Sequence, residues 1–149
     1  MAINPTSIYT IQSLSNTISN TNYGQDINVT SDLLPIFTLV TGTTLLGNAA
    51  YRRIITPYGA LGLIGGNPNY GIGAYSWLAS EATSANIANW QLQTTKQLNQ
   101  DERIRTSTCQ INFNNSILTM NIVLSPFVGQ SFSMVVQIGN ITGQELIGT

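Results

Sequence analysis

The C-terminal third of the chain decides the fold, because residues 109–138 read CQINFNNSILTMNIVLSPFVGQSFSMVVQI. The alternating apolar positions are Cys109, Ile111 and Phe113, then Leu118, Met120, Ile122 and Leu124, then Phe132, Met134, Val136 and Ile138. Strict alternation in three runs predicts antiparallel strands with one buried face, since successive side chains of a strand point to opposite faces. Asn114-Asn115 between the first two runs favours a tight hairpin turn, because Asn tolerates left-handed backbone geometry.

The middle of the chain predicts helices that would cover this buried face. Hydroxyl groups in residues 41–44 suit an N-terminal cap, and apolar residues then follow at helical spacing. This helix should end near Ile55 or Thr56, because Pro57 disfavours helical geometry just before it. Ser84 is a candidate cap for a second helix over residues 85–99. One side of that helix carries Ile87, Trp90 or Gln91, Thr94 and Leu98.

The remaining segments predict shorter or irregular structure. Residues 1–24 carry no charge and indicate an extended or loosely helical arm that orders against a partner. Residues 25–29 and 36–40 resemble short strands, and residues 57–73 contain enough Gly and Pro to form a shaped loop. A helical turn over residues 74–79 should point Trp77 and Leu78 inward.

These patterns together predict an α+β fold. We expect a two-layer domain in which a C-terminal antiparallel sheet of about three strands packs against two or three helices. The extended N-terminal arm would comprise residues 1–24, and the domain residues 25–149.

The small share of charged residues indicates that the protein is part of a larger assembly. Charged residues make up 7% of the 149 residues, against about a quarter in ordinary soluble domains. Neutral polar groups lose little on desolvation at a protein interface, whereas buried Lys and Glu cost much more. A net charge of −1 with five basic residues makes nucleic acid an unsuitable partner. We also expect no membrane insertion, because the sequence has no basic signal-peptide start and no apolar run near 18 residues.

The residue types that most enzymes need are scarce. The chain has no His, six scattered carboxylates and one cysteine, Cys109, on an apolar face. We therefore expect a buried inert thiol, no metal, no cofactor and no catalysis. The glycines of residues 59–66 lack the following Lys-Ser/Thr of a phosphate cradle. The Asp101-Glu102 pair is flanked by arginines that would keep both carboxylates ionised, which argues against a neutral general acid.

Six charged residues form the candidate partner-binding set: Asp101, Glu102, Arg103, Arg105, Arg52 and Arg53. Five of the eleven charges in the chain fall within residues 96–105. The cluster is either a solvated turn at a helix–strand junction or an ionic clamp against a neighbouring subunit. A buried charge pair would fix register more than it adds stability.

Several stretches carry a resemblance to a known family. They are Gly24–Ile27, Phe37–Val40 with Gly42, Arg52–Leu61 (RRIITPYGAL), Asn67–Gly71 (NPNYG), and Leu98 with Asp101–Ile104. In this order and spacing, over about residues 24–139, the chain resembles the baseplate wedge and sheath-initiator family of contractile phage tails. That family also supplies a type VI secretion baseplate component and was once described as lysozyme-like. Two departures stand out: Glu102 replaces the proline of the family's acid-Pro-Arg turn, and residues 62–66 look like an insertion.

The resemblance implies a structural subunit of the virion tail baseplate, assembled in the bacterial host cytoplasm. Its partners would be baseplate wedge proteins and the tail sheath protein, with tube or hub proteins as further candidates. Strands 117–124 and 131–139 have no charge to repel an incoming strand, so sheath assembly could begin by strand pairing. Two alternatives stay open: another tail adaptor, such as a terminator or completion protein, and a lysozyme-like hydrolase.

Overall fold

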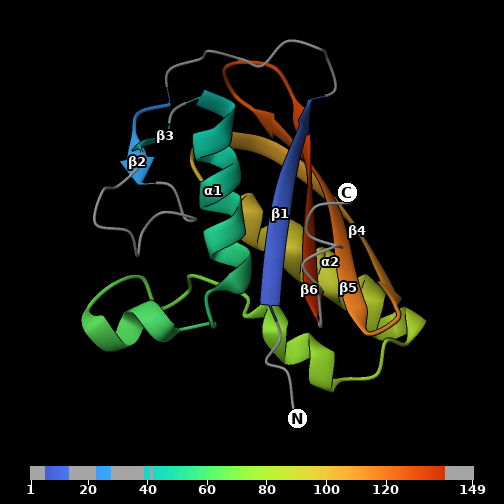
Figure 1. The fold of residues 1–149 in the computed structure, drawn as a ribbon. Coiled ribbons are helices and arrows are strands. Elements are labelled where there is room, and N and C mark those ends of the chain that lie inside the picture. The colour runs from blue at the N-terminus through green and yellow to red at the C-terminus, as the bar shows by residue number, and fades with distance from the viewer. Residues whose placement is uncertain (1–5, 14–22, 28–38, 41, 140–149) are drawn as a thin grey trace.

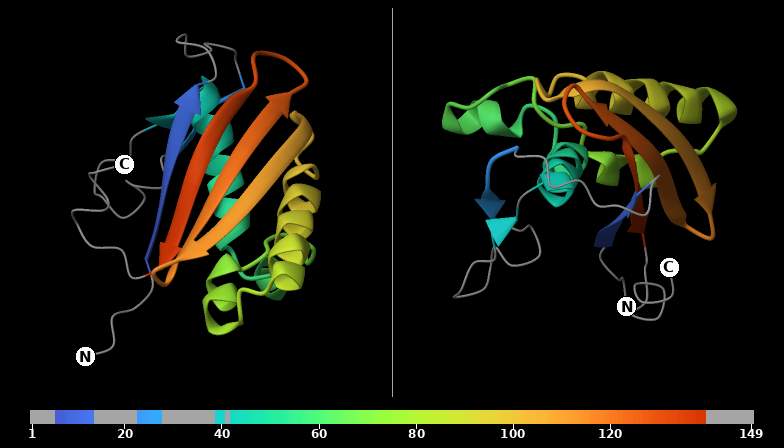
Figure 2. Two further views of the ribbon diagram at one scale, coloured as in Figure 1. Left: turned by 90° about the vertical axis from the view of Figure 1, so that its right-hand side faces the viewer. Right: turned by 90° about the horizontal axis from the view of Figure 1, so that it is seen from above.

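The computed structural model describes residues 6–13, 23–27, 39–40 and 42–139. Its elements follow in the order β1 (Thr6–Ser13), β2 (Asp26–Ile27), β3 (Leu39–Val40), α1 (Gly42–Ile55), the 3₁₀ helices η1 (Ala60–Ile64) and η2 (Ala74–Ala79), α2 (Ser84–Leu98), β4 (Ile104–Asn114), β5 (Ile117–Pro126) and β6 (Phe132–Gly139). Helices and sheet form two layers, with α1 and α2 on the same face of the sheet (Figures 1 and 2). The predicted α+β class is therefore confirmed.

The main sheet is antiparallel throughout, with strand order β1-β6-β5-β4. Asn115 and Ser116 turn the β4–β5 hairpin, with φ of 51° and 63°. Positive φ at both central residues is what a tight hairpin requires. The turn lies one residue later than predicted, because Asn114 still pairs with Ile117 across the two strands.

The core lies between the sheet and the helices. The predicted inward positions of β5 and β6 are all buried, whereas Phe113 near the end of β4 is 36% exposed. Trp77 of η2 stacks on Trp90 of α2 with ring centroids 5.2 Å apart. Burying each large apolar side chain contributes about 1.5–3 kcal/mol, so this continuous cluster supplies the main driving force for folding.

The fourth strand, β1, comes from the N-terminal arm. The extended conformation was one of the two expected for this arm, but its pairing with the chain's own β6 was not predicted. Tyr9 of β1 packs on Tyr51 of α1 with ring centroids 4.7 Å apart. Gly47 of α1 lies directly below Ile11: a Cβ placed there would sit 2.5 Å from the Ile11 Cδ1. The strand and the helix can approach closely because residue 47 has no side chain.

The local predictions hold with shifts at the element ends. The first helix spans Gly42–Ile55 and stops before Pro57 as expected. The second begins one residue early, because Thr83 and not Ser84 is the cap: its hydroxyl accepts the Asn86 backbone N–H at 3.1 Å. The two short strand-like stretches pair as β2 and β3, and residues 28–38, which include the rest of both predictions apart from Gln25, lie outside the described residues. Among the described residues, no helix is long and apolar enough to cross a membrane.

Candidate functional site

Asp101 and Arg103 form the centre of the charged turn between α2 and β4. Asp101 is 8% exposed. Its Oδ1 accepts the Arg103 backbone N–H at 3.0 Å and the Arg103 Nε–H at 2.9 Å, and its Oδ2 accepts from Nη2 at 2.7 Å. The two-pronged contact matches the planar fork of a guanidinium to a carboxylate. The turn is therefore fixed by the Asp101–Arg103 ion pair.

The pair also determines the ionisation of Asp101. Burial acts to raise the pKa of this carboxyl. The hydrogen bonds and positive charge of Arg103, with a smaller contribution from Arg53, outweigh burial and hold the pKa of Asp101 below its ordinary value. Asp101 is consequently an ionised acceptor and a poor proton donor.

Arg53 joins this turn to the glycine-rich loop. Its guanidinium lies over the Tyr70 ring, 4.6 Å from the centroid. Its Nη1 donates to the Gln97 Oε1 at 3.0 Å. Arg53 also lines the same small hollow as Glu102 and the Asp101–Arg103 pair. Helix α1, the loop and the end of α2 therefore meet at one side chain.

The other predicted charges lie elsewhere. Glu102 is exposed and lies next to the pair. Arg105 lies over Phe127 of the β5–β6 loop, 5.6 Å from the ring centroid. Arg52 lies on the other side of α1, where it acts on Tyr9 of β1; there burial, followed by Tyr51, raises the pKa of Tyr9, and Arg52 counteracts the rise. The structure thus brings together four of the six predicted residues and separates Arg52 and Arg105 from them.

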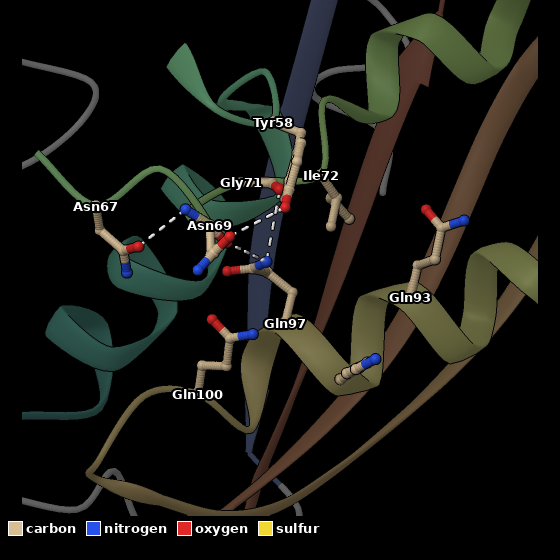
Figure 3. A pocket seen from close by; sticks show the side chains of 9 residues that line it. Tyr58, Asn67, Asn69, Gly71, Ile72, Gln93, Gln97 and Gln100 are labelled. Carbon is tan, nitrogen blue, oxygen red and sulfur yellow. Dashed lines mark hydrogen bonds between the residues drawn. The ribbon is translucent and has the colours of Figure 1, made fainter. Parts of the chain in front are cut away.

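An open pocket of about 620 Å³ lies beside this junction, between the loop and α2 (Figure 3). Its lining is Tyr58, Asn67, Asn69, Gly71, Ile72, Gln93, Lys96, Gln97 and Gln100. Gln97 forms the floor: its Nε2 donates to the Asn69 carbonyl at 3.1 Å and to the Gly71 carbonyl at 3.5 Å. The Gln97 Oε1 accepts a hydrogen bond from Arg53, so both ends of the Gln97 amide are bonded within the protein. Through Arg53, Gln97 also connects the pocket to the charged turn.

The loop that forms one wall is pinned to the end of α1. The N–H of Ile72 donates to the Arg53 carbonyl at 3.1 Å, and that of Gly73 to the Thr56 carbonyl at 2.9 Å. Gly71 has φ of 94°, and a Cβ there would lie 2.3 Å from the Thr56 oxygen. Only glycine is accommodated at position 71, because both the positive φ and the short contact exclude a side chain.

This pocket, which we call the amide pocket, was not predicted from the sequence. The polar residues Gln93, Lys96 and Gln97 follow one another at helical spacing along α2, and Gln100 lies in the turn after it. In the sequence this is the pattern of an ordinary solvated helix face. What distinguishes them is the loop opposite, which belongs to a segment about 30 residues earlier in the chain. A row of polar residues on a helix and a glycine-rich loop indicate a pocket only when the two are known to pack against each other.

Further chemical groups are few among the described residues. No group of three or more His, Cys, Asp or Glu there could hold a metal ion. Burial raises the pKa of the Cys109 thiol to about 12, so a thiolate nucleophile would not form at neutral pH.

In comparisons with known proteins, no family model matches the chain, and neither the curated proteins nor the solved structures contain a significant match.

Proposed function

We propose that the chain is a structural subunit of a contractile-tail baseplate wedge, which joins inner baseplate proteins and seeds sheath assembly by strand pairing. The observation that carries the proposal is the convergence of the resembling stretches. Arg53, Tyr70 and Asp101 belong to three separate stretches, and Arg53 joins them: its guanidinium lies over the Tyr70 ring and its charge acts on Asp101. Residues that share one site in space are those on which a common function would depend.

The sheet supports pairing with a partner at its two edges alone. Strands β5 and β6, which the sequence suggested as partners for an incoming strand, lie in the middle of the sheet and already pair on both sides. Within the part of the chain that the structure describes, the edges are β1 and β4. On β4, the outward N–H of Ile111 donates to the Gln91 Oε1 of α2 at 2.9 Å. Because α2 occupies part of that edge, β1 is the edge that favours strand addition.

The face of the sheet away from the helices fits an interface as well. Its central positions are Thr108, Gln110 and Asn112 of β4, Thr119, Asn121 and Val123 of β5, and Ser133, Val135 and Gln137 of β6. None of these side chains carries a charge. A partner covering this face would therefore not have to desolvate an ion.

The hydrolase alternative is weakened by the state of its candidate acid. Glycoside hydrolysis needs one carboxyl group that is protonated at working pH. The Arg103 side chain keeps Asp101 ionised and occupies both of its oxygens. A cell-wall clearing assay with an Asp101→Asn, Glu102→Gln double variant decides the matter: lysis by the wild type that disappears in the variant would support the hydrolase.

Deletion of the chain from the assembling system tests the proposed function. We expect negative-stain images to show baseplates or tubes without sheath, because polymerisation lacks its starting ring. Sheaths of normal length and frequency in the deletion would contradict the proposal. Sheaths that form normally but end irregularly at the far end of the tube would instead support a terminator.

A substitution at the charged turn tests the site without testing the fold. Arg103→Glu is a poor probe, because it places a second carboxylate against buried Asp101. Glu102→Lys changes an exposed side chain and should leave unfolding unchanged while reducing incorporation into baseplates. The matched control is Glu81→Lys, an equally exposed reversal before α2. Equal incorporation of both variants would show that the charged turn does not contact a partner.

A further inference from the structure

The pocket between the glycine-rich loop and α2 has an unusual chemical lining. Five of its nine residues are Asn or Gln, and Lys96 is the one charged residue among the nine. Lys96 is also the single lysine of the chain. The pocket therefore offers many amide donors and acceptors around one positive charge.

The wall and floor of the pocket are held in place by hydrogen bonds within the protein. The Tyr58 hydroxyl donates to the Asn69 Oδ1 at 3.1 Å, and the Asn69 N–H donates to the Asn67 Oδ1 at 2.9 Å. Gln97 holds the same loop from below (Figure 3). A site held in place in this way loses little conformational entropy on binding.

On the α2 side of the pocket, three polar side chains make no hydrogen bond or ion pair with other described residues. Gln93, Lys96 and Gln100 are exposed, and no hydrogen bond or ion pair joins their side chains to another described residue. Gln93 and Lys96 lie three residues apart on α2 and so share one face of the helix, and Gln100 lies in the turn that follows α2. Together they present two amide groups and one ammonium group to the pocket.

We propose that this pocket binds an extended segment of a partner protein that carries an acidic side chain. Gln93 and Gln100 pair with its backbone amides, since a carboxamide offers both a donor and an acceptor. Lys96 pairs with its carboxylate. The same loop exposes Leu63 and Ile64, which are 89% and 82% accessible, as apolar contacts for the rest of the partner. A neutral glycan satisfies the amides but leaves Lys96 without an ionic partner, so a peptide is favoured.

Titration of the ¹⁵N-labelled protein tests the proposal independently of assembly. The probes are the blocked tripeptides Ac-Ser-Asp-Ser-NHMe and Ac-Ser-Asn-Ser-NHMe, with chitotriose as the glycan. We expect the Asp peptide to shift the amide resonances of Gln93, Lys96 and Gln100, and to bind about fivefold more tightly than the Asn peptide, which is the size of a partly exposed ion pair. The preference should shrink as salt is added.

Three variants identify the groups responsible. Lys96→Gln should abolish the preference for Asp while leaving binding of the Asn peptide unchanged, and Gln100→Ala should weaken both peptides. The control Gln110→Ala, an exposed glutamine on β4, should change neither. Equal affinity of the two peptides for the wild type, shifts produced by chitotriose alone, or no shift with any probe would each overturn the proposal. None of these outcomes depends on whether the chain belongs to a baseplate.

Discussion

Replacing Gly71 by Ala should destabilise the protein far more than the same change at most other glycines. An alanine at φ of 94° carries a left-handed backbone penalty of about 1–2 kcal/mol. Its Cβ would also lie 2.3 Å from the Thr56 carbonyl oxygen and 3.0 Å from the Thr56 carbonyl carbon. These are backbone atoms at the end of α1, so they can retreat only by moving the helix end, at a further cost of about 1–3 kcal/mol.

Gly65 provides a matched control. It has φ of 84°, but nothing lies within 4 Å of the position of an added Cβ. Gly65→Ala therefore carries the backbone penalty alone, reduced by the lower entropy of the unfolded chain, and should cost about 1 kcal/mol. Gly71→Ala carries the same net backbone cost of about 1 kcal/mol and, in addition, the steric cost of about 1–3 kcal/mol. Its total cost should therefore be about 2–4 kcal/mol.

Urea unfolding followed by circular dichroism measures both variants at neutral pH. A domain of this size has a stability of about 5–15 kcal/mol, so both proteins should still fold. The reasoning is refuted if the two variants lose the same free energy of unfolding within about 0.5 kcal/mol. Gly71→Ala should also weaken binding to the amide pocket, because the Gly71 carbonyl is one of the two acceptors for Gln97.

Two other predictions follow from buried groups. Asp101→Asn should lower the free energy of unfolding at neutral pH by about 1–3 kcal/mol. Since the pKa of Asp101 is held low, its contribution is present above about pH 4 and disappears as pH falls through the lowered value, so wild type and variant should converge in strong acid; a constant difference across pH contradicts this. Cys109, whose pKa burial raises to about 12, should resist iodoacetamide in the native protein and react once urea unfolds it. Equal rates in both states would mean that the thiol is accessible.

The position of the strands narrows how a partner could join the sheet. An added strand needs a free row of backbone donors and acceptors, which central strands do not have. Gln91 shows how the fold occupies one edge, because its side chain takes the Ile111 N–H that would otherwise point outward. Gln91 thereby acts against unwanted pairing at β4, while β1 has a strand partner on one side only among the described residues.

The sequence alone determined three strands of the sheet, the two long helices and the burial of Cys109. Alternation in residues 118–124 and 132–138 predicted buried faces that the structure confirms, because a strand with period two can bury only one set of its side chains. Pro57 likewise set the end of α1 through its own backbone geometry. These features depend on residues that are close in the sequence, so they can be predicted without knowledge of the tertiary structure.

Tertiary structure alone decided strand order, the site and the role of each charge. Nothing in residues 6–13 marks them as the partner of β6, because their pairing depends on Gly47 and Tyr51 of a helix far along the chain. Arg52 and Arg53 are neighbours in sequence, yet Arg52 acts on Tyr9 of β1 whereas Arg53 lies over Tyr70 of the glycine-rich loop. A charge acquires its function from what packs against it, and those contacts come from segments that the sequence does not place together.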